Sequence, residues 1–331
     1  MARRTRVVCI GTGGFARYHL QSMLDQTRTT EIVGLVEIGE ASREATRVLF
    51  AKKQAACPAF YCSLAEFIAD GGAADASLIC TPHKYHFENV RDSLLNGLDV
   101  LVEKPMVMNA AEARRLIDLR DKTGKLVVVG FPGSLSPAVK KAKELLRAGA
   151  IGKVTAVTAW VHQAWKTATV GKWRQDPVIS GGGFLFDTGS HMINTVVELL
   201  GEDVAEVSAV LDNCGTPVEI NAAVGGRSTS GIMFSLGAAG DSIQCISDVM
   251  VFGEAGVLQT GIWGERLNVK TKAKPEFKPV TLPKSLGVWG QFVKVRQGRM
   301  DNPCPPEIGL RFARLMDMIY ASARKGRVVK A

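Results

Sequence analysis

The stretch that decides the fold is VVCIGTGGFA, residues 7–16. Its first four residues are apolar and predict a buried strand, and helical periodicity begins at Phe15. The turn between them follows the pattern Gly11-x-Gly13-x-x-Ala16. In such a turn the first glycine permits a tight bend, the second lets the backbone approach a pyrophosphate, and a small third residue allows close packing of helix on strand. The stretch predicts dinucleotide binding at a helix N-terminus, with an incidental glycine-rich turn as the alternative.

An acidic residue ends the second predicted strand. Residues 31–37 (EIVGLVE) form an apolar run that closes on Glu37, 21 residues beyond Ala16. At this distance a carboxylate is expected to hydrogen-bond the ribose hydroxyls of a dinucleotide. A carboxylate also repels a 2′-phosphate, so we expect NAD as the cofactor. NADP is the alternative, because Arg43 is near enough in sequence to accept that phosphate.

Strands and helices alternate over the first 130 residues. We expect strands at 7–10, 31–37, 59–61, 76–80, 100–102 and 126–130, with helices at 15–25, 41–53, 64–68, 86–96 and 110–123. Apolar strands separated by helices are typical of a parallel sheet covered on both faces. The fold class is therefore α/β, with an N-terminal doubly wound Rossmann sheet. Such sheets bind ligands outside the carboxyl ends of their strands.

Polar or turn-forming residues follow several of these strands and should share that ligand-binding edge. Lys104, in the run Glu103-Lys104-Pro105, could position a substrate hydroxyl and help a proton to move, or could be a surface lysine in a turn. His83 and His86 could contact the cofactor or belong to a polar helix start. We expect cofactor contacts from the following residues: Gly11, Thr12, Gly13, Gly14, Phe15, Ala16, Glu37, Cys80, Thr81, Pro82, His83, His86, Glu103, Lys104 and Pro105.

The pattern changes after about residue 137. A helix at 137–148 and a long strand at 154–163 precede a helix at 185–200. Closely spaced apolar runs with short links then predict a large open, mainly antiparallel sheet. Its strands are expected at 205–211, 219–224, 228–236, 241–252, 257–259 and 267–270, before a last helix at 307–325. We divide the chain into a Rossmann domain at 1–130, a substrate and oligomerisation domain at 131–304, and a C-terminal helix at 305–331.

The second half contains a candidate proton-transfer pair. In GGGFLFDTGSH, residues 181–191, Asp187 and His191 are four positions apart on a predicted helix and so share a face. Histidine titrates near neutral pH, which suits removal of a proton from an alcohol. A helix-terminal acid beside a structural histidine is the alternative. Trp173-Arg174 could line a substrate pocket, with arginine binding hydroxyls or a carboxylate, or could be a packed tryptophan beside a surface arginine.

Composition restricts the class of protein. The chain has 331 residues, a formal net charge of +9 and seven cysteines without a C-x-x-C pair. We expect a reduced, cytoplasmic protein without a leader, a membrane span or a metal site. The basic residues are dispersed, so nucleic-acid binding is the least favoured function, while a basic surface suits an anionic dinucleotide.

The order of the motifs resembles the Gfo/Idh/MocA oxidoreductase family, the relatives of glucose-fructose oxidoreductase and inositol dehydrogenase. The resemblance covers nearly the whole chain and rests on the glycine run, Thr81-Pro82 with His83 and His86, Glu103-Lys104-Pro105, Trp173-Arg174, Gly181-Gly182-Gly183 with Asp187-x-x-x-His191, residues 306–310 (PEIGL) and residues 320–323 (YASA).

The resemblance implies hydride transfer between a nicotinamide and a sugar, polyol or inositol-like alcohol or ketone. It places Lys104 between nicotinamide and substrate, makes His191 the general acid or base, and has Asp187 orient it or bind a substrate hydroxyl. Trp173 and Arg174 would also contact substrate. It further implies a C-terminal helix packed on the Rossmann domain and a homodimer or homotetramer formed through the second domain's sheet.

One segment departs from the family pattern. After Phe131 relatives often carry Asn and Arg, whereas this chain has Pro132-Gly133-Ser134-Leu135, which bears on the substrate more than on the reaction class. The alternative function is a non-catalytic sensor or regulator of the same fold that holds NAD. Such a protein is expected to lose the lysine or the histidine, and this chain keeps Lys104, Asp187 and His191.

Overall fold

A computed structural model describes residues 3–331 of the chain. Internal contacts divide it into two compact units. The first unit runs to Val107 and adds Ala111–Gly130 and Val288–Glu307. The second comprises Met108–Ala110, Phe131–Gly287 and Ile308–Ala331. The expected boundary at residue 304 thus falls inside a segment that belongs to the first unit, and the predicted packing of the C-terminal helix on the Rossmann domain stays a prediction.

The first unit is built on a six-stranded parallel sheet, as predicted. Its strand order is β3-β2-β1-β4-β5-β6, which is that of a doubly wound Rossmann sheet. The strands are β1 (Thr5–Ile10), β2 (Thr30–Val36), β3 (Phe60–Tyr61), β4 (Ala76–Ile79), β5 (Asp99–Val102) and β6 (Val127–Val129). The helices between them are α1 (Gly14–Leu24), α2 (Glu40–Lys52), α3 (Leu64–Ala69), the 3-10 turn η1 (His83–Tyr85), α4 (His86–Leu95) and α5 (Ala110–Thr123).

The apolar character of the central strands explains their position. Every residue of β4 is buried, as are all but one of β1 and of β5, because both faces of a parallel sheet are covered. The strand order reverses between β1 and β4, which pair with each other. Ligands of such sheets bind at this switch point, so the fold places the turn after β1 where a dinucleotide is expected.

A segment from the far end of the sequence completes the first unit. Helix α12 (Gly287–Arg296), which the sequence did not predict, carries Trp289, and this side chain is only 1% exposed. The indole Nε1 of Trp289 donates a hydrogen bond to Oγ1 of Thr30, at 2.8 Å. The backbone N–H of Val129 donates to the carbonyl of Cys304, also at 2.8 Å, and so extends the hydrogen bonding of the sheet beyond β6.

The second unit contains a nine-stranded sheet. Its order is β14-β13-β12-β11-β7-β10-β9-β8-β15, and every neighbouring pair is antiparallel except β7 with β10. This confirms the mainly antiparallel prediction. The strands are β7 (Val154–His162), β8 (Val204–Asp212), β9 (Asn221–Ser228), β10 (Met233–Ala239), β11 (Ile246–Gly253), β12 (Gly256–Thr260), β13 (Leu267–Thr271), β14 (Lys274–Pro279) and β15 (Val329–Lys330). The strand predicted at 228–236 was wrong at its start, because Ser228 ends β9 and residues 229–232 form the turn to β10.

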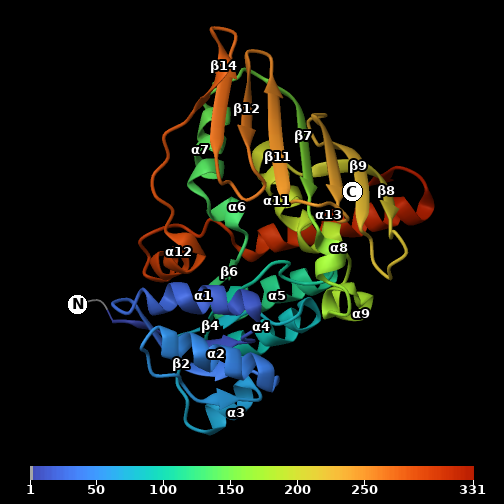
Figure 1. Cartoon of the computed structure of the whole chain (residues 1–331). Coiled ribbons are helices and arrows are strands. Elements are labelled where there is room, and N and C mark those ends of the chain that lie inside the picture. Colours follow the sequence, from blue (N-terminus) through green and yellow to red (C-terminus); the bar gives the residue numbers. More distant parts are fainter. Residues whose placement is uncertain (1–2) are drawn as a thin grey trace. The chain divides into compact units, whose positions relative to one another are not determined.

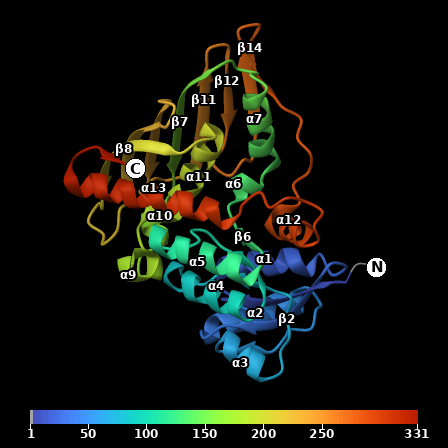
Figure 2. The ribbon, with the colours of Figure 1, turned by 180° about the vertical axis from the view of Figure 1, so that it is seen from behind.

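Helices cover one face of this sheet. Figures 1 and 2 show α7 (Pro137–Arg147), α11 (Gly189–Leu200) and α13 (Pro306–Lys325) on the same side of the strands. All residues of α11 are buried, so this helix forms the centre of the unit's core. The short helices of the unit are α6 (Pro132–Leu135), α8 (Trp165–Ala168), the 3-10 turn η2 (Trp173–Gln175), α9 (Pro177–Ser180) and α10 (Phe184–Asp187).

One helix predicted from the sequence is two helices in the structure. The helix expected at 185–200 consists of α10 and α11, which meet at Thr188. Asp187 is the last residue of α10, and His191 lies in the first turn of α11. Within residues 3–331, no helix combines the length and apolarity needed to cross a membrane. All seven cysteines lie in this range and are free thiols.

Candidate active site

The glycine turn after β1 is shaped for close approach of a ligand. Gly11 has φ +84°, and a Cβ there would lie 2.9 Å from the backbone of Cys80 and Thr81, so only glycine fits. A Cβ on Gly13, by contrast, would meet no atom within 4 Å. Gly13 also precedes the first residue of α1, whose N-terminal N–H groups favour a phosphate. The turn therefore fits a pyrophosphate at the start of α1.

Glu37 lies beside this turn. Its Oε2 accepts hydrogen bonds from the backbone N–H and the hydroxyl of Thr12, at 2.8 and 3.1 Å. Its Oε1 accepts from the N–H of Gly39 at 2.8 Å, so the carboxylate is fixed by donors from two loops. Nε of Arg43 donates to the carbonyl oxygen of Glu37 at 2.7 Å. The structure thus places the predicted ribose-binding acid next to the predicted pyrophosphate-binding turn.

Glu103 connects α1, the helix that follows the glycine turn, to Lys104. The carboxylate is buried, and its Oε1 lies 2.8 Å from Nε2 of His19 on α1. Its Oε2 accepts from the backbone N–H of Lys104 at 3.2 Å. Gly130 leaves room for this carboxylate, because a Cβ there would lie 2.8 Å from Oε1. Glu103 therefore holds the backbone of Lys104 in place, and the peptide from Lys104 to Pro105 is cis.

His86 connects two of the loops at the same edge of the sheet. Its Nδ1 lies 2.7 Å from the carbonyl oxygen of Pro105, and its Nε2 lies 2.8 Å from that of Thr81. Burial lowers the pKa of His86 and so favours the neutral imidazole. A neutral imidazole donates from only one nitrogen, so one of these two carbonyls accepts its hydrogen bond and the other lies in contact with the ring. The ring of His83 lies 5.8 Å away and is also buried. His86 thus ties the loop after β4 to the turn that contains Lys104.

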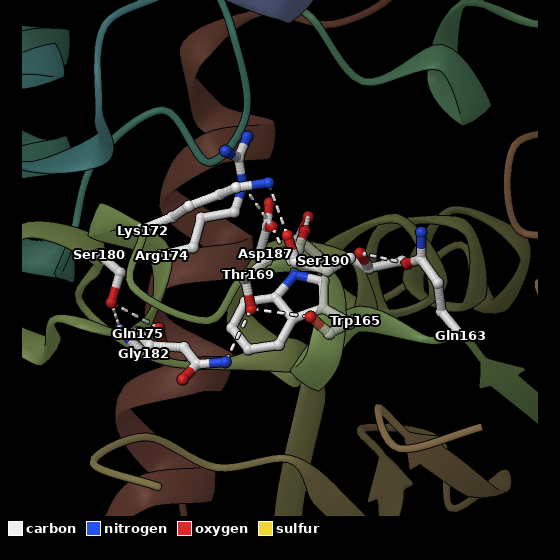
Figure 3. Close-up of polar contacts among 12 residues, drawn as sticks. Gln163, Trp165, Thr169, Lys172, Arg174, Gln175, Ser180, Gly182, Asp187 and Ser190 are labelled. Atoms are coloured by element: carbon white, nitrogen blue, oxygen red, sulfur yellow. Dashed lines mark hydrogen bonds and ion pairs between the residues drawn. The ribbon is translucent and has the colours of Figure 1, made fainter. Parts of the chain in front are cut away.

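In the second unit, Asp187 is held by two donors. Its Oδ2 accepts from the indole Nε1 of Trp165 at 2.9 Å and from Nε of Arg174 at 3.0 Å (Figure 3). The guanidinium of Arg174 also lies 4.4 Å from the centre of the Trp173 ring. Asp187 is buried, so these donors replace the hydrogen bonds that water would make. The structure therefore brings the predicted residues Trp173, Arg174 and Asp187 together and adds Trp165.

A buried acid explains the three glycines before α10. A Cβ on Gly183 would lie 1.9 Å from the carbonyl oxygen of Glu219, and one on Gly182 would lie 2.0 Å from the hydroxyl of Tyr320. Oε1 of Glu219 accepts from the N–H of Phe186 at 3.2 Å and from the Tyr320 hydroxyl at 3.1 Å. These glycines thus allow a close approach of the protein's own chain, and Glu219 fixes the helix turn that carries Asp187.

His191 contacts the aromatic rings of Phe131 and Trp263. The Phe131 ring meets it edge-on, with centroids 6.2 Å apart and an interplanar angle of 88°. The Trp263 ring, from the loop between β12 and β13, has its centroid 5.9 Å from the imidazole. These contacts fix a largely buried histidine at the start of α11, where its imidazole could take part in proton transfer.

Sequence reasoning missed Trp165, Glu219, Tyr320 and Trp263. Residue type offered one general signal, because a buried tryptophan such as Trp165 needs a partner for its N–H. The other contacts join positions about 70 to 100 residues apart. Within residues 3–331, no group of three or more His, Cys, Asp or Glu side chains is arranged to hold a metal ion.

Two family models match the chain. Residues 5–131 match the model described as "Oxidoreductase family, NAD-binding Rossmann fold", and residues 139–259 match the "GFO/IDH/MocA C-terminal domain". The matches occur in the order of the two units and together cover most of the sequence.

Curated relatives are similar over parts of their length. "Oxidoreductase P35" of Formosa agariphila is 32% identical over 42% of this chain and 44% of its own length, and the "D-glucoside 3-dehydrogenase" of Escherichia coli is 29% identical over 38% and 36%. The aligned region thus spans less than half of these two relatives. The "scyllo-inositol 2-dehydrogenase (NAD(+))" of Bacillus subtilis is 25% identical over 73% of this chain and 67% of its own length.

Solved structures share the fold over the full chain. An aldose-aldose oxidoreductase from Caulobacter crescentus, complexed with glycerol, has a TM-score of 0.85 at 21% identity and covers 99% of this chain and 100% of its own. The WlbA dehydrogenase from Bordetella pertussis, in complex with NADH and UDP-GlcNAcA, has a TM-score of 0.84 at 21% identity, with 99% of both chains covered. With both family models matched in order, the chain belongs to the Gfo/Idh/MocA family of NAD-binding oxidoreductases.

Proposed function

We propose that this protein is an NAD(P)-dependent dehydrogenase or reductase that acts on a CH–OH group of a sugar, polyol or inositol-like compound. The observation that carries the proposal is the fixed arrangement of Asp187, Arg174 and Trp165 immediately before His191. An acid held this firmly, four positions before a candidate proton carrier, suits acid–base chemistry on a hydroxyl group. The names of relatives that act on inositols and glucosides support the substrate class.

The residues of the first unit fit a dinucleotide. Gly11, Thr12, Gly13 and the start of α1 would hold the pyrophosphate, and Glu37 would bind the ribose hydroxyls. We propose NAD rather than NADP, because the Glu37 carboxylate repels a 2′-phosphate and Nε of Arg43 donates to the Glu37 carbonyl. The bound nicotinamide supplies the chemistry of accepting or donating a hydride.

The protein's own residues would manage the proton. We propose that His191 removes a proton from the substrate hydroxyl during oxidation and returns it during reduction. Lys104 would hydrogen-bond a substrate oxygen and stabilise negative charge that develops on it. Its backbone position is set by Glu103 and by the His86 contact to Pro105. Asp187 would orient His191 or bind a neighbouring hydroxyl, with Trp173 and Arg174 lining the substrate site.

A non-catalytic sensor is the alternative, and no observation favours it. The lysine, the aspartate and the histidine are all present, and the relatives described above are named as oxidoreductases or dehydrogenases. We also propose a cytoplasmic location, which the free cysteines support. A homodimer or homotetramer formed through the nine-stranded sheet is proposed as well. Exposed Val210, Met233 and Ile246, which the strand register places on one face of that sheet, support such an interface.

The proposal is tested with purified protein, NAD+ and a panel of sugars and inositols, by following the absorbance of the reduced nicotinamide. Lys104→Ala and His191→Ala should each lower kcat by about 10²–10⁴-fold, because the first removes the group that stabilises the oxygen's charge and the second removes the proton carrier. NADH binding, measured by fluorescence, should be retained in both. Wild-type rates in both variants would contradict the assignment of these residues, and tight NADH binding without turnover of any substrate would favour the sensor.

A further inference from the structure

The indole of Trp263 lies beside the candidate proton carrier and has no role in the reaction as proposed so far. Its ring centroid is 5.9 Å from that of His191, at an interplanar angle of 55°. Trp263 is half-buried, whereas His191 is 8% exposed. Aromatic side chains that line ligand sites commonly present a fixed face to the ligand, which requires that the backbone beneath them is held.

The loop that carries Trp263 is held from several sides. The hydroxyl of Thr195, on α11, donates to the carbonyl of Ile262 at 2.7 Å. The N–H of Trp263 donates to Oε2 of Glu265 at 3.2 Å, and the N–H of Gly264 donates to the carbonyl of Gly261 at 3.0 Å. Because Thr195 lies one helical turn beyond His191, the same helix positions both the histidine and the tryptophan loop.

The unusual segment Pro132–Leu135 makes room for this loop. It forms α6, and a Cβ on Gly133 would lie 2.4 Å from the hydroxyl of Thr195 and 3.3 Å from the carbonyl of Ile262. Ser134 accepts a hydrogen bond from Nδ2 of Asn194 at 2.8 Å. A larger side chain at position 133 would therefore collide with α11 and with the loop that carries Trp263. Gly133 allows α6 to pack closely against both.

We propose that Trp263 is a specificity-determining residue: its indole face receives the C–H face of a ring-shaped sugar or polyol whose hydroxyl group is presented to His191. The inference rests on the proposed function. The face of an aromatic ring is electron-rich and attracts the weakly positive hydrogens of C–H bonds. A pyranose or an inositol ring presents several such bonds on one face, and an acyclic polyol does not hold them in one plane.

The test compares ring-shaped and acyclic substrates in the full-length enzyme with NAD+. The ring-shaped probes are myo-inositol, D-glucose and D-xylose, and the acyclic probes are sorbitol and xylitol. Trp263→Leu should lower kcat/KM for the ring-shaped probe that is turned over best by about tenfold, mainly through a higher KM. Turnover of the acyclic probes and the KM for NAD+ should change by less than about twofold. Trp263→Phe should restore most of the loss, because phenylalanine keeps an aromatic face.

The chain offers a matched control. Trp160 is also half-buried and also contacts a histidine, His162, with ring centroids 5.1 Å apart on β7. Trp160→Leu should leave the ratio of ring-shaped to acyclic turnover unchanged. Equal losses on both substrate classes in Trp263→Leu would overturn the proposal, since the indole would then only support His191, and so would wild-type kinetics. Absence of turnover on every probe by the unsubstituted enzyme, with NADH still bound, would overturn the dehydrogenase assignment itself and this inference with it.

Discussion

We propose that cofactor preference depends chiefly on the carboxylate of Glu37. Hydrogen bonds from Thr12 and Gly39 fix this carboxylate. The 2′-phosphate of NADP would meet its negative charge. We expect Glu37→Ala to raise the ratio of kcat/KM for NADP+ to that for NAD+ by about tenfold or more, because like charges brought together are strongly unfavourable. The measurement is steady-state kinetics with both cofactors.

Glu40→Ala is the control for this change. Glu40 is exposed at the start of α2 and pairs with Arg47, so its removal should leave the cofactor ratio as it is. An unchanged ratio in Glu37→Ala would remove the argument for NAD.

Glu219 is a buried acid whose charge state should affect stability. Burial raises its pKa, so the folded protein holds the proton more tightly than the unfolded chain does. The stabilisation is therefore present below the ordinary pKa of Glu and is lost as pH rises through the raised value. Glu219→Gln keeps an oxygen that accepts from Phe186 and Tyr320 but cannot ionise. Its free energy of unfolding, relative to wild type, should rise as the pH increases from the ordinary pKa of Glu through the raised pKa of Glu219.

The comparison needs an exposed acid as its reference. Glu276 on β14 is exposed and pairs with Lys278, so Glu276→Gln should show little of this dependence. Parallel pH curves for Glu219→Gln and wild type would show that Glu219 does not titrate differently on folding.

At the scale of elements, α10 depends on the backbone that precedes it. Gly183 is the residue before its first turn, and an added Cβ would lie 1.9 Å from the Glu219 carbonyl. Gly183→Ala should lower the free energy of unfolding by about 1–3 kcal/mol, because rigid backbone atoms must move to admit the methyl group. It should also lower kcat, since α10 carries Asp187. Chemical denaturation and steady-state kinetics measure the two effects.

A second glycine provides the matched control. Gly225 lies within β9, where an added Cβ would meet no atom within 4 Å. Gly225→Ala should change stability by less than about 0.5 kcal/mol. Equal stabilities for the two variants would mean that the backbone at Glu219, just before β9, yields to the methyl group.

For the whole molecule, the first unit is assembled from distant parts of the sequence. Trp289 donates to Thr30 across 259 positions and is almost fully buried. Trp289→Ala should destabilise this unit by about 3–5 kcal/mol through the cavity left behind. Hydrogen exchange of the β1 and β2 amides should accelerate accordingly, and NADH binding should weaken. Trp289→Phe, which keeps most of the volume, should lose much less. Unchanged protection of β1 and β2 in Trp289→Ala would show that α12 is not part of the unit's core.

Much of the first unit followed from local patterns. Its six strands and the helices between them were predicted to within a few residues, because apolar periodicity and glycine turns act over short stretches of chain. The predicted helix at 185–200 failed locally: nothing in its periodicity revealed the change from α10 to α11 at Thr188. The short helices α6, α8 and α9 and helix α12 carry too little periodicity to be found in this way.

The sequence by itself determined the Rossmann sheet, the glycine turn beside Glu37, and the identity of the candidate catalytic residues. This was possible because strands, turns and helix starts are local structures, and residue type and spacing over a short stretch predict them. Only the tertiary structure decided what contacts those residues. Trp165 donates a hydrogen bond to Asp187, the Glu219 backbone lies against Gly183, and the Trp263 ring lies beside His191. These contacts join positions from 22 to about 70 residues apart, and such pairings arise from packing the whole unit rather than from any local pattern.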